Sequence, residues 1–402
     1  MLVKVKRPFL FKATSSIGSR TFLLVAACTA LIAATYGLVR LAFGLHLPEI
    51  SADLGIDAAS AGAASAAGSL VYGAAAAAGF LFGERYPRAL VVAAAVTAGG
   101  GSLGMASAQE PTSFFFWSAV SSAGAGLASP AIVRIVHRGV PVRDRAPMQS
   151  IANAGTGPGL VAAGLIAWAI VPDWRLAWVI AAAATVVAAA AILALDRSRR
   201  APRGRSVRLP PLSWWVSHRV PLVATVLFGV SAAAVWNFGR VVLVEAGAPE
   251  ALSVLAWVLL GCGGAAVILT APLTRTVTSR RLWLISAASS ALGTAAVGLF
   301  PDDPVLAGSG CALFGWGYVM ATGALIGWTT QIDPDRAAAG TAMLFVVVMI
   351  GQAVGATVLG AMLAHVDAAL GFSAAAAVGC VAGTLGLSRA GSHLDRSPDD
   401  SA

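Results

Sequence analysis

Two arginines lie inside long apolar segments of the sequence, where a charged side chain requires a reason. Arg40 and Arg240 are 200 positions apart, and each follows an aromatic residue, Tyr36 or Trp236, by four positions. A charge at the centre of a membrane-spanning helix costs at least about 2.5–3.5 kcal/mol on insertion scales. Two guanidinium groups that face each other would bind a carboxylate or phosphate through forked hydrogen bonds, and this is the chemistry that the pair predicts.

A second interpretation is that the two arginines snorkel to the outer membrane interface. Arg40 follows Thr21 by 19 residues, or about 28 Å of helix, which places it in the outer part of a span. Snorkelling does not require both helices to carry arginine at equivalent positions, so the repeat favours the anion clamp.

Side chains three or four positions from each arginine would share its face of the helix. Around the two arginines these positions are held by Tyr36, Phe43, Trp236 and Asn237. Aromatic rings there would pack a substrate or stack on a guanidinium group, although an interfacial aromatic belt has the same composition. The other candidate polar contacts inside apolar segments are Asn153, Gln352, Trp316, Tyr318 and Thr322. Uncharged polar groups in such segments also hydrogen-bond to neighbouring helices.

The elements that would position these residues are membrane-spanning helices. Of the 402 residues, 58% are apolar and 11% are charged, with a mean hydropathy of +0.81, whereas an ordinary soluble domain is about 25% charged. This composition excludes a soluble fold, a disordered chain, a disulfide scaffold and a nucleic-acid-binding module.

Apolar segments of about 20 residues, the length that crosses a hydrocarbon core, recur along the chain. They predict an all-α membrane protein with twelve transmembrane helices. The predicted spans are residues 21–45, 60–82, 89–106, 113–136, 148–171, 176–195, 220–244, 252–271, 282–300, 305–329, 341–364 and 368–388.

The distribution of basic residues predicts the orientation of these helices. Of the 27 Lys and Arg residues, 24 fall in the tails and in the connections after even-numbered spans, and only Arg175 falls in the connections on the other side. Both termini are therefore predicted to be cytoplasmic, in a multi-pass protein of the cell (inner) membrane. The net charge of +9 then faces the inner leaflet and does not indicate a nucleic-acid partner.

The chain divides into two matching halves. A cytoplasmic tail (1–20) precedes the first six-helix bundle (21–195), and an Arg- and Pro-rich cytoplasmic linker (196–218) leads to the second bundle (219–388) and a second cytoplasmic tail (389–402). A duplicated six-helix unit is a recurring transporter plan, with the binding site between the halves near the midplane. We therefore predict two pseudo-symmetric bundles.

Two further matches support the duplication. Asp144-Arg145-Ala146 opens the fifth helix and Asp335-Arg336-Ala337 opens the eleventh. They are followed by Gly155-x-x-x-Gly159 and Gly351-x-x-x-Gly355. Such glycine pairs allow close approach of helices, so we expect them to pack helices together and not to bind substrate.

Several runs give the chain a resemblance to the major facilitator superfamily over nearly its whole length. They are residues 47–56 at the exit from the first helix, residues 79–88 between the second and third helices, and residues 174–178 at the entry to the sixth. The run 36–43 is also similar to the first helix of the organophosphate:phosphate antiporters, in which paired arginines on helices one and seven bind the phosphate. The resemblance implies a twelve-helix secondary transporter of major facilitator type.

Candidates for coupling and gating are fewer. No carboxylate lies in a predicted mid-span position, so the weak candidates for coupling are Glu245, at the end of the seventh helix, and Glu49, just past the first. Each is expected to be a solvated helix-end residue. Reversible ion pairs on the cytoplasmic face would make an inner gate, although the same charges also serve topology alone. The candidate gating residues are Glu84, Arg85, Arg88, Asp144, Arg145, Asp335 and Arg336.

We therefore expect a secondary active transporter, not an enzyme, that moves a small solute by alternating access. The leading hypothesis for the solute is an organic anion, with a proton or a counter-anion as coupling partner and the lipid bilayer around a monomeric chain. No cysteine or histidine spacing supports a metal, and no cofactor is expected. The alternatives are a drug or small-metabolite efflux antiporter of the same superfamily and a polytopic membrane enzyme or receptor, for which no catalytic motif is present.

Overall fold

The computed structural model describes residues 18–197, 211–274 and 276–388, and every regular element in this part of the chain is helical. The first half contains α2 (Ser19–Ile32), η2 (Ala33–Arg40), α3 (Phe43–Leu54), α4 (Ala58–Phe82), α5 (Pro87–Ser107), α6 (Pro111–Gly139), η3 (Val142–Asp144), α7 (Arg145–Asn153), α8 (Thr156–Ile170) and α9 (Trp174–Leu195). The second half contains α10 (Leu212–Ser217), α11 (Arg219–Glu245), α12 (Glu250–Thr274), α13 (Ser279–Leu299), α14 (Pro304–Ile332), η4 (Pro334–Arg336), α15 (Ala337–Leu363), α16 (Ala368–Thr384) and η5 (Leu385–Leu387).

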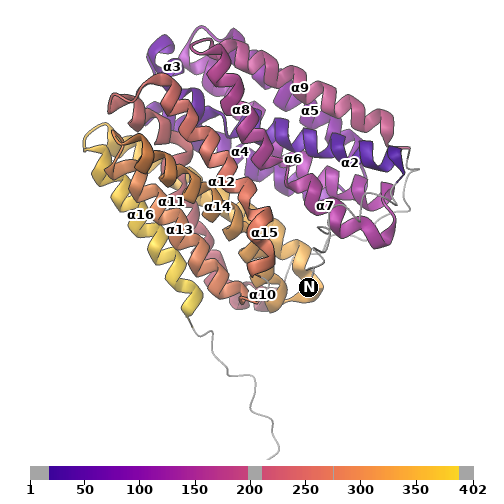
Figure 1. The fold of residues 1–402 in the computed structure, drawn as a ribbon. Helices are drawn as coiled ribbons and strands as arrows, with labels where there is room; N and C mark the ends of the chain where they lie inside the picture. The colour runs from indigo at the N-terminus through magenta and orange to yellow at the C-terminus, as the bar shows by residue number, and fades with distance from the viewer. Residues whose placement is uncertain (1–17, 198–210, 275, 389–402) are drawn as a thin grey trace, which may run out of the picture.

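Twelve spans of the described chain are long and apolar enough to cross a membrane, which confirms the predicted number. Eleven of them begin and end within three residues of the predicted bounds. The chain forms two bundles of six spans, drawn from indigo to magenta and from red to yellow in Figure 1. The protein is thus an all-α, multi-pass membrane protein.

The first span is the exception, because it continues to Leu54. A π-helical segment, η2, interrupts it, and here the N–H of Leu41 donates to the carbonyl of Tyr36, five residues earlier, at 2.8 Å. π-helical segments inside α-helices are frequently found at functional sites. The π-helical segment ends at Arg40, so this arginine lies at the junction between π-helical and α-helical geometry in the first span.

The predicted end of the first span at residue 45 is wrong, although the observed end falls within the exit run 47–56. Helix α3 passes through Pro48 and ends at Leu54, and the following Gly55 has a φ of 67°, the left-handed conformation that glycine favours after a helix. Proline removes one backbone donor from a helix. The burial of Leu45, Leu47 and Ile50, each at most 1% exposed, outweighs that loss here.

The two bundles are assembled by equivalent helix pairs. In the first, η2 packs on α8, α4 packs on α6, and α5 packs on α6 and α9. In the second, α11 packs on α15, α12 packs on α14, and α13 packs on α14 and α16. This equivalence is the structural counterpart of the sequence repeat.

The glycines of the fifth and eleventh spans bring helices together within each bundle. A Cβ atom on Gly155 would lie 2.4 Å from the carbonyl oxygen of Thr29 in α2, and one on Gly351 would lie 2.2 Å from that of Val226 in α11. Both distances are far below van der Waals contact, so a side chain at either position would force the backbones apart. These glycines therefore pack helices, as predicted.

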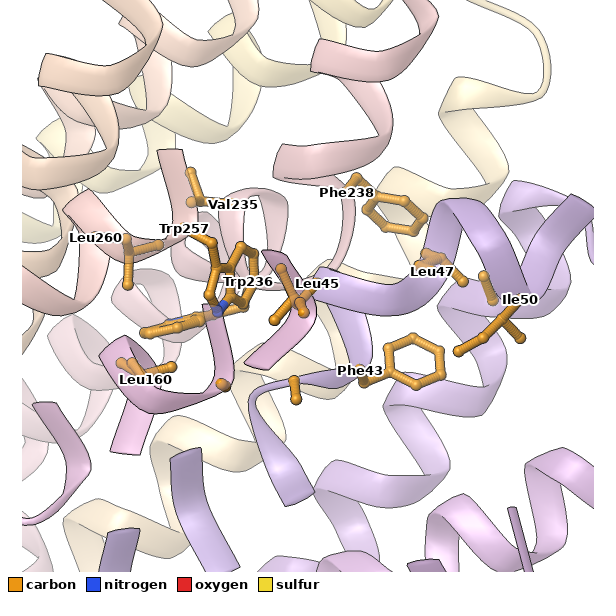
Figure 2. Packing of buried hydrophobic residues seen from close by; sticks show 14 of the residues in the cluster. Phe43, Leu45, Leu47, Ile50, Leu160, Val235, Trp236, Phe238, Trp257 and Leu260 are labelled. Carbon is orange, nitrogen blue, oxygen red and sulfur yellow. The ribbon is translucent and has the colours of Figure 1, made fainter. Parts of the chain in front are cut away.

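Three helix pairs make most of the contact between the bundles, namely α4 with α15, α8 with α12, and α3 with α11. An apolar cluster shown in Figure 2, which we call the interbundle cluster, fills this contact. Its labelled members are Phe43, Leu45, Leu47, Ile50, Leu160, Val235, Trp236, Phe238, Trp257 and Leu260. Residues 45–50 follow most of the first span, so the cluster lies away from the end where that span begins.

The opposite end of the molecule is rich in arginine, and we call it the arginine-rich end. The start of the first span meets the end of the sixth here, because Arg20 Nη2 donates to the carbonyl of Leu195 at 2.7 Å. In the second bundle, Arg280 Nη1 donates to the carbonyl of Ser388 at 3.0 Å. The first bundle therefore begins and ends on this side, and the second bundle also ends here.

The last residues of the predicted linker form α10 and dock on the second bundle. The ring of Trp214 stacks on His218 with centroids 3.9 Å apart. His218 Nε2 lies 2.9 Å from Thr329 Oγ1 in α14. Burial lowers the pKa of His218 below its usual range, so the imidazole is neutral at pH 7 and joins α10 to α14 through a neutral hydrogen bond.

Candidate functional site

A small cavity lies between the two bundles. Its volume is about 30 Å³, room for about two water molecules. The first bundle contributes Arg40, serines of α4 and α6, and the rings of Phe43 and Trp178. The second contributes Trp236, Asn237 and Gln352. The cavity is therefore polar at its serines and amides and apolar at its aromatic rings.

The guanidinium group of Arg40 reaches from the first bundle to the second. Its Nη2 donates to Gln352 Oε1 at 3.2 Å and lies 2.7 Å from Met349 Sδ, both on α15. The group also lies over the ring of Tyr72, 4.5 Å from its centroid, and Nη2 is 3.5 Å from Ser69 Oγ. These partners are all neutral, and no ion pair of the described chain includes Arg40.

Tyrosine hydroxyls form a layer around Arg40. The hydroxyl groups of Tyr36 and Tyr72 are 2.7 Å apart, and Gln352 Nε2 donates to the hydroxyl of Tyr318 at 3.0 Å. Tyr36, predicted as a substrate contact, is not part of the cavity lining. Its hydrogen bond instead holds Tyr72, whose ring packs on Arg40.

Arg240 has a different environment. It is 1% exposed, and its Nη1 donates to Glu49 Oε2 at 2.6 Å while its Nη2 lies 2.6 Å from Glu49 Oε1. Nη1 also donates to the carbonyl of Leu45 at 2.5 Å, and Nε donates to Ser253 Oγ at 3.0 Å. Glu49 and Leu45 belong to α3, so this buried ion pair joins the two bundles beside the interbundle cluster.

The position of Glu49 differs from the prediction. Its side chain is 11% exposed, inside helix α3, and not at a solvated helix end. The expectation was wrong because the helix continues through Pro48. A buried carboxylate is therefore present in the first span, where none was expected.

The structure does not bring Arg40 and Arg240 together around one space. Arg240 is neutralised by Glu49 and does not line the cavity, whereas Arg40 lines it. A clamp of two free guanidinium groups is therefore absent from the described conformation. Arg40 lines the cavity and Arg240 is 1% exposed, so neither side chain extends to the outside of the bundles as snorkelling would require.

Three other predicted contacts do line the cavity, namely Trp236, Asn237 and Gln352. Asn237 Oδ1 accepts a hydrogen bond from the Ser65 hydroxyl of the other bundle. Its Nδ2 donates to the carbonyl of Ala233 in its own helix at 2.7 Å. Asn237 is thus fixed in orientation and joins the bundles at the cavity.

Two predicted residues lie elsewhere. Asn153 is exposed at the end of α7, where its Oδ1 accepts from Gln149 Nε2 at 3.0 Å. Glu245 is exposed at the end of α11, as expected for a helix-end residue. Neither lines the cavity.

The predicted gating residues gather at the arginine-rich end and form contacts within their own bundle. Their ion pairs are Glu84–Arg134, Arg88–Asp196, Arg143–Asp144 and Arg336–Asp333. Arg85 lies over the ring of Tyr86, Arg145 donates to the carbonyl of Val140, and Asp335 is exposed. No ion pair of the described residues joins the bundles at this end, so the role of these residues as an inner gate stays a prediction.

Sequence reasoning missed the serines and one tryptophan of the lining. Ser65 and Ser69 are one helical turn apart on α4, and α6 adds three more serines. This i, i+4 spacing in a small-residue helix is the pattern that would have indicated a polar face. Trp178 belongs to the run that supported the family resemblance, and nothing in its spacing predicts that it faces inward.

Two tryptophan side chains of the lining have indole N–H groups without a described acceptor. The Nε1 atoms of Trp178 and Trp236 are buried, and neither has a hydrogen-bond partner in the part of the chain that the structure describes. A buried donor without an acceptor costs about 1–3 kcal/mol. The lining therefore has a surplus of donors.

Comparisons with known proteins identify the family and the fold to which this architecture corresponds. A model of the Major Facilitator Superfamily matches residues 25–356. No curated protein sequence matches the chain. Among solved structures, the nucleoside transporter NupG is similar with a TM-score of 0.73 and 14% identity, over 92% of this chain and 98% of that one.

Two further structures show the same likeness. A POT family transporter in complex with 5-aminolevulinic acid has a TM-score of 0.74 and 13% identity, over 91% of this chain and 95% of that one. A D-xylose-proton symporter has a TM-score of 0.72 and 14% identity, over 91% and 96%. At these identities the likeness establishes the fold and not the solute.

Proposed function

Since the chain belongs to the major facilitator superfamily, we propose that it is a secondary active transporter that moves a small organic anion by alternating access. The assignment of an anionic solute rests on the environment of Arg40. Its guanidinium group lines the cavity between the bundles, and its described partners are all neutral. Burying a charge without a counter-charge is costly. An anion in the cavity supplies that counter-charge through charge-assisted hydrogen bonds, which are about twice as strong as neutral ones.

The donors around Arg40 support the same ligand. The indole N–H groups of Trp178 and Trp236 lack acceptors, and carboxylate oxygens are acceptors only. Gln352 and Ser69 both accept from Arg40 Nη2 and so orient the guanidinium group. An anion is the class of ligand that satisfies this lining.

In this proposal the Arg240–Glu49 pair and the interbundle cluster form the outer gate. Opening that side separates α3 from α11 and lets water reach both charges, which removes much of the cost of burying them. The candidate gating residues at the arginine-rich end form the inner gate, with that end and both termini in the cytoplasm. The described conformation then has its outer side closed.

Glu49 is the carboxylate that we assign to coupling. A proton on Glu49 removes the negative charge that holds Arg240, and so weakens the contact between α3 and α11. Uptake driven by a proton gradient is then expected to be lost in Glu49→Gln. Exchange of one anion for another is the alternative, and it would survive that substitution.

Thermal unfolding of the purified protein tests the proposed solute class. The ligands are small carboxylates, phosphate esters and lipophilic cations, and the variants are Arg40→Met and, as a matched control, Arg175→Met. Arg175 pairs with Asp53 and does not line the cavity. We expect carboxylates to stabilise the wild type and Arg175→Met but not Arg40→Met. Stabilisation by lipophilic cations alone, equal in all three proteins, would overturn the proposal and favour drug efflux.

A further inference from the structure

The charge of the cavity lining limits the charge of its ligand. Among the described residues that line the cavity, Arg40 is the only charged one. A ligand with one negative charge makes the closed site neutral, whereas a dianion leaves one charge without a partner. An unpaired charge in a closed, low-dielectric space carries a large desolvation penalty.

The second arginine does not change this balance. Arg240 is the equivalent residue of the other half, but both oxygens of Glu49 lie 2.6 Å from its guanidinium nitrogens. Its remaining contacts are the carbonyl of Leu45 and the hydroxyl of Ser253. A phosphate ester or a dicarboxylate would need two arginines free to bind it. Only Arg40 is free in this way among the two.

Most other polar side chains of the lining already donate to acceptors of the protein, and none of them is charged. The hydroxyls of Ser121 and Ser122 donate to the carbonyl of Ser118, at 2.8 and 3.0 Å. The amide nitrogens of Asn237 and Gln352 donate to a backbone carbonyl and to Tyr318. Among the described nitrogen donors of the lining, the guanidinium of Arg40 has no carboxylate partner and the indoles of Trp178 and Trp236 have no acceptor, so they make one set for one anionic group.

The rest of the lining is apolar. Phe43 and Met105 belong to it, together with the faces of the two tryptophan rings. Aromatic and sulfur-containing walls of this kind bury the carbon skeleton of a ligand. The lining therefore combines one anion-binding group with an apolar wall.

We infer that the substrate is a monocarboxylate with a compact apolar body, and that dicarboxylates and phosphate esters are excluded. This inference rests on the proposed function, since it assigns the substrate class of the same cavity. The carboxylate accepts from Arg40 and the two indoles, and the carbon skeleton packs against Phe43 and Met105. Glu49 contributes to the selectivity for one negative charge indirectly, because its ion pair with Arg240 leaves Arg40 as the arginine that can bind the ligand.

Matched pairs of ligands test the charge rule. Each dicarboxylate is compared with its monomethyl ester, which has nearly the same size and one charge fewer; the probes are succinate, glutarate, phthalate and terephthalate. Dissociation constants are measured by calorimetry on the purified full-length protein, at a pH where both carboxyl groups are ionised. Inorganic phosphate and glycerol 3-phosphate complete the set. The variants are Arg40→Met and the control Arg175→Met.

We expect at least one monomethyl ester to bind tenfold or more tightly than its dicarboxylate, with binding retained in Arg175→Met and weakened at least tenfold in Arg40→Met. Tighter binding of a dicarboxylate or a phosphate, still lost in Arg40→Met, would overturn the monocarboxylate inference and leave the anion transporter intact. If no pair binds and the screen finds no stabilising anion, both the inference and the proposed function fail. The two failures are therefore distinguishable.

Discussion

Arg40 and Arg240 hold equivalent places in two copies of one structural unit, yet their surroundings differ. Arg240 is 1% exposed and has a carboxylate, a carbonyl and a hydroxyl as partners. Arg40 lines the cavity, and its partners are an amide, a thioether, a hydroxyl and a ring. The charge of Arg240 is thus neutralised within the protein, whereas the charge of Arg40 has no counter-charge among its described partners.

The difference shows how a duplicated unit can divide its tasks. A single carboxylate, Glu49, reaches across from the first bundle and converts the second arginine into a contact between the bundles. The repeat explains why both arginines exist, but the environment of each determines its role. Four predictions test this division, from the largest expected effect to the smallest.

Separating the buried ion pair should have the largest effect. Glu49→Leu or Arg240→Met leaves one buried charge without a partner, which costs about 3–5 kcal/mol of unfolding free energy. The double variant should recover most of that loss, because an apolar pair replaces the ion pair. Unfolding in mixed micelles measures all three, with Asp53→Leu at the exposed pair Asp53–Arg175 as the control. Single variants no less stable than this control would contradict the structural role.

Removing the other arginine should affect binding and not stability. Arg40→Met eliminates a charge without a counter-charge, so we expect its melting temperature to equal or exceed that of the wild type. Charged hydrogen bonds contribute about 1.5–3 kcal/mol, so carboxylate affinity should fall by about 10- to 150-fold. Calorimetry and thermal unfolding give the two readouts. A strongly destabilised Arg40→Met would show that the two arginines are alike after all.

Ser253→Ala sharpens the comparison on the side of Arg240. It leaves Arg240 Nε without its acceptor at 3.0 Å, and an unsatisfied buried donor costs about 1–3 kcal/mol. Carboxylate affinity should stay at the wild-type value, because Ser253 does not line the cavity. A loss of affinity with unchanged unfolding would instead connect Ser253 to the ligand.

Gln352→Leu is the matching change beside Arg40 and should have the smallest effect. It removes the acceptor that orients Arg40 Nη2 at 3.2 Å. A hydrogen bond of about 0.5–1.5 kcal/mol corresponds to a loss of about 2- to 12-fold in carboxylate affinity. The measurement is a calorimetric titration beside Val354→Leu, a change at an exposed position of the same helix. An affinity equal to that of the control would remove Gln352 from the site.

Most of the fold could be predicted from sequence, because hydropathy and the placement of arginine act over whole spans. The number of spans and the bounds of eleven of them follow from the length of the apolar segments. The first span could not be bounded in this way. Pro48 is typical of a helix end, and only the packing of α3 against α11 explains why the helix continues.

Only part of the candidate site could be predicted from the sequence. The cost of a charge in a span identified Arg40 and Arg240, and helical spacing identified Trp236 and Asn237. The partner of Arg240 was missed, since Glu49 comes from the other bundle and follows a proline. Contacts between segments almost 200 residues apart leave no local pattern in the sequence.

Carboxylate binding by two variants tests the central claim most directly. The variants are Arg40→Met and the double variant Glu49→Leu/Arg240→Met, measured by calorimetry with the carboxylate that stabilises the wild type best. We predict that the double variant binds within about threefold of the wild type, a difference below 1 kcal/mol, and that Arg40→Met binds about 10- to 150-fold more weakly. Wild-type affinity in Arg40→Met together with lost binding in the double variant would contradict the assignment of the anion to Arg40.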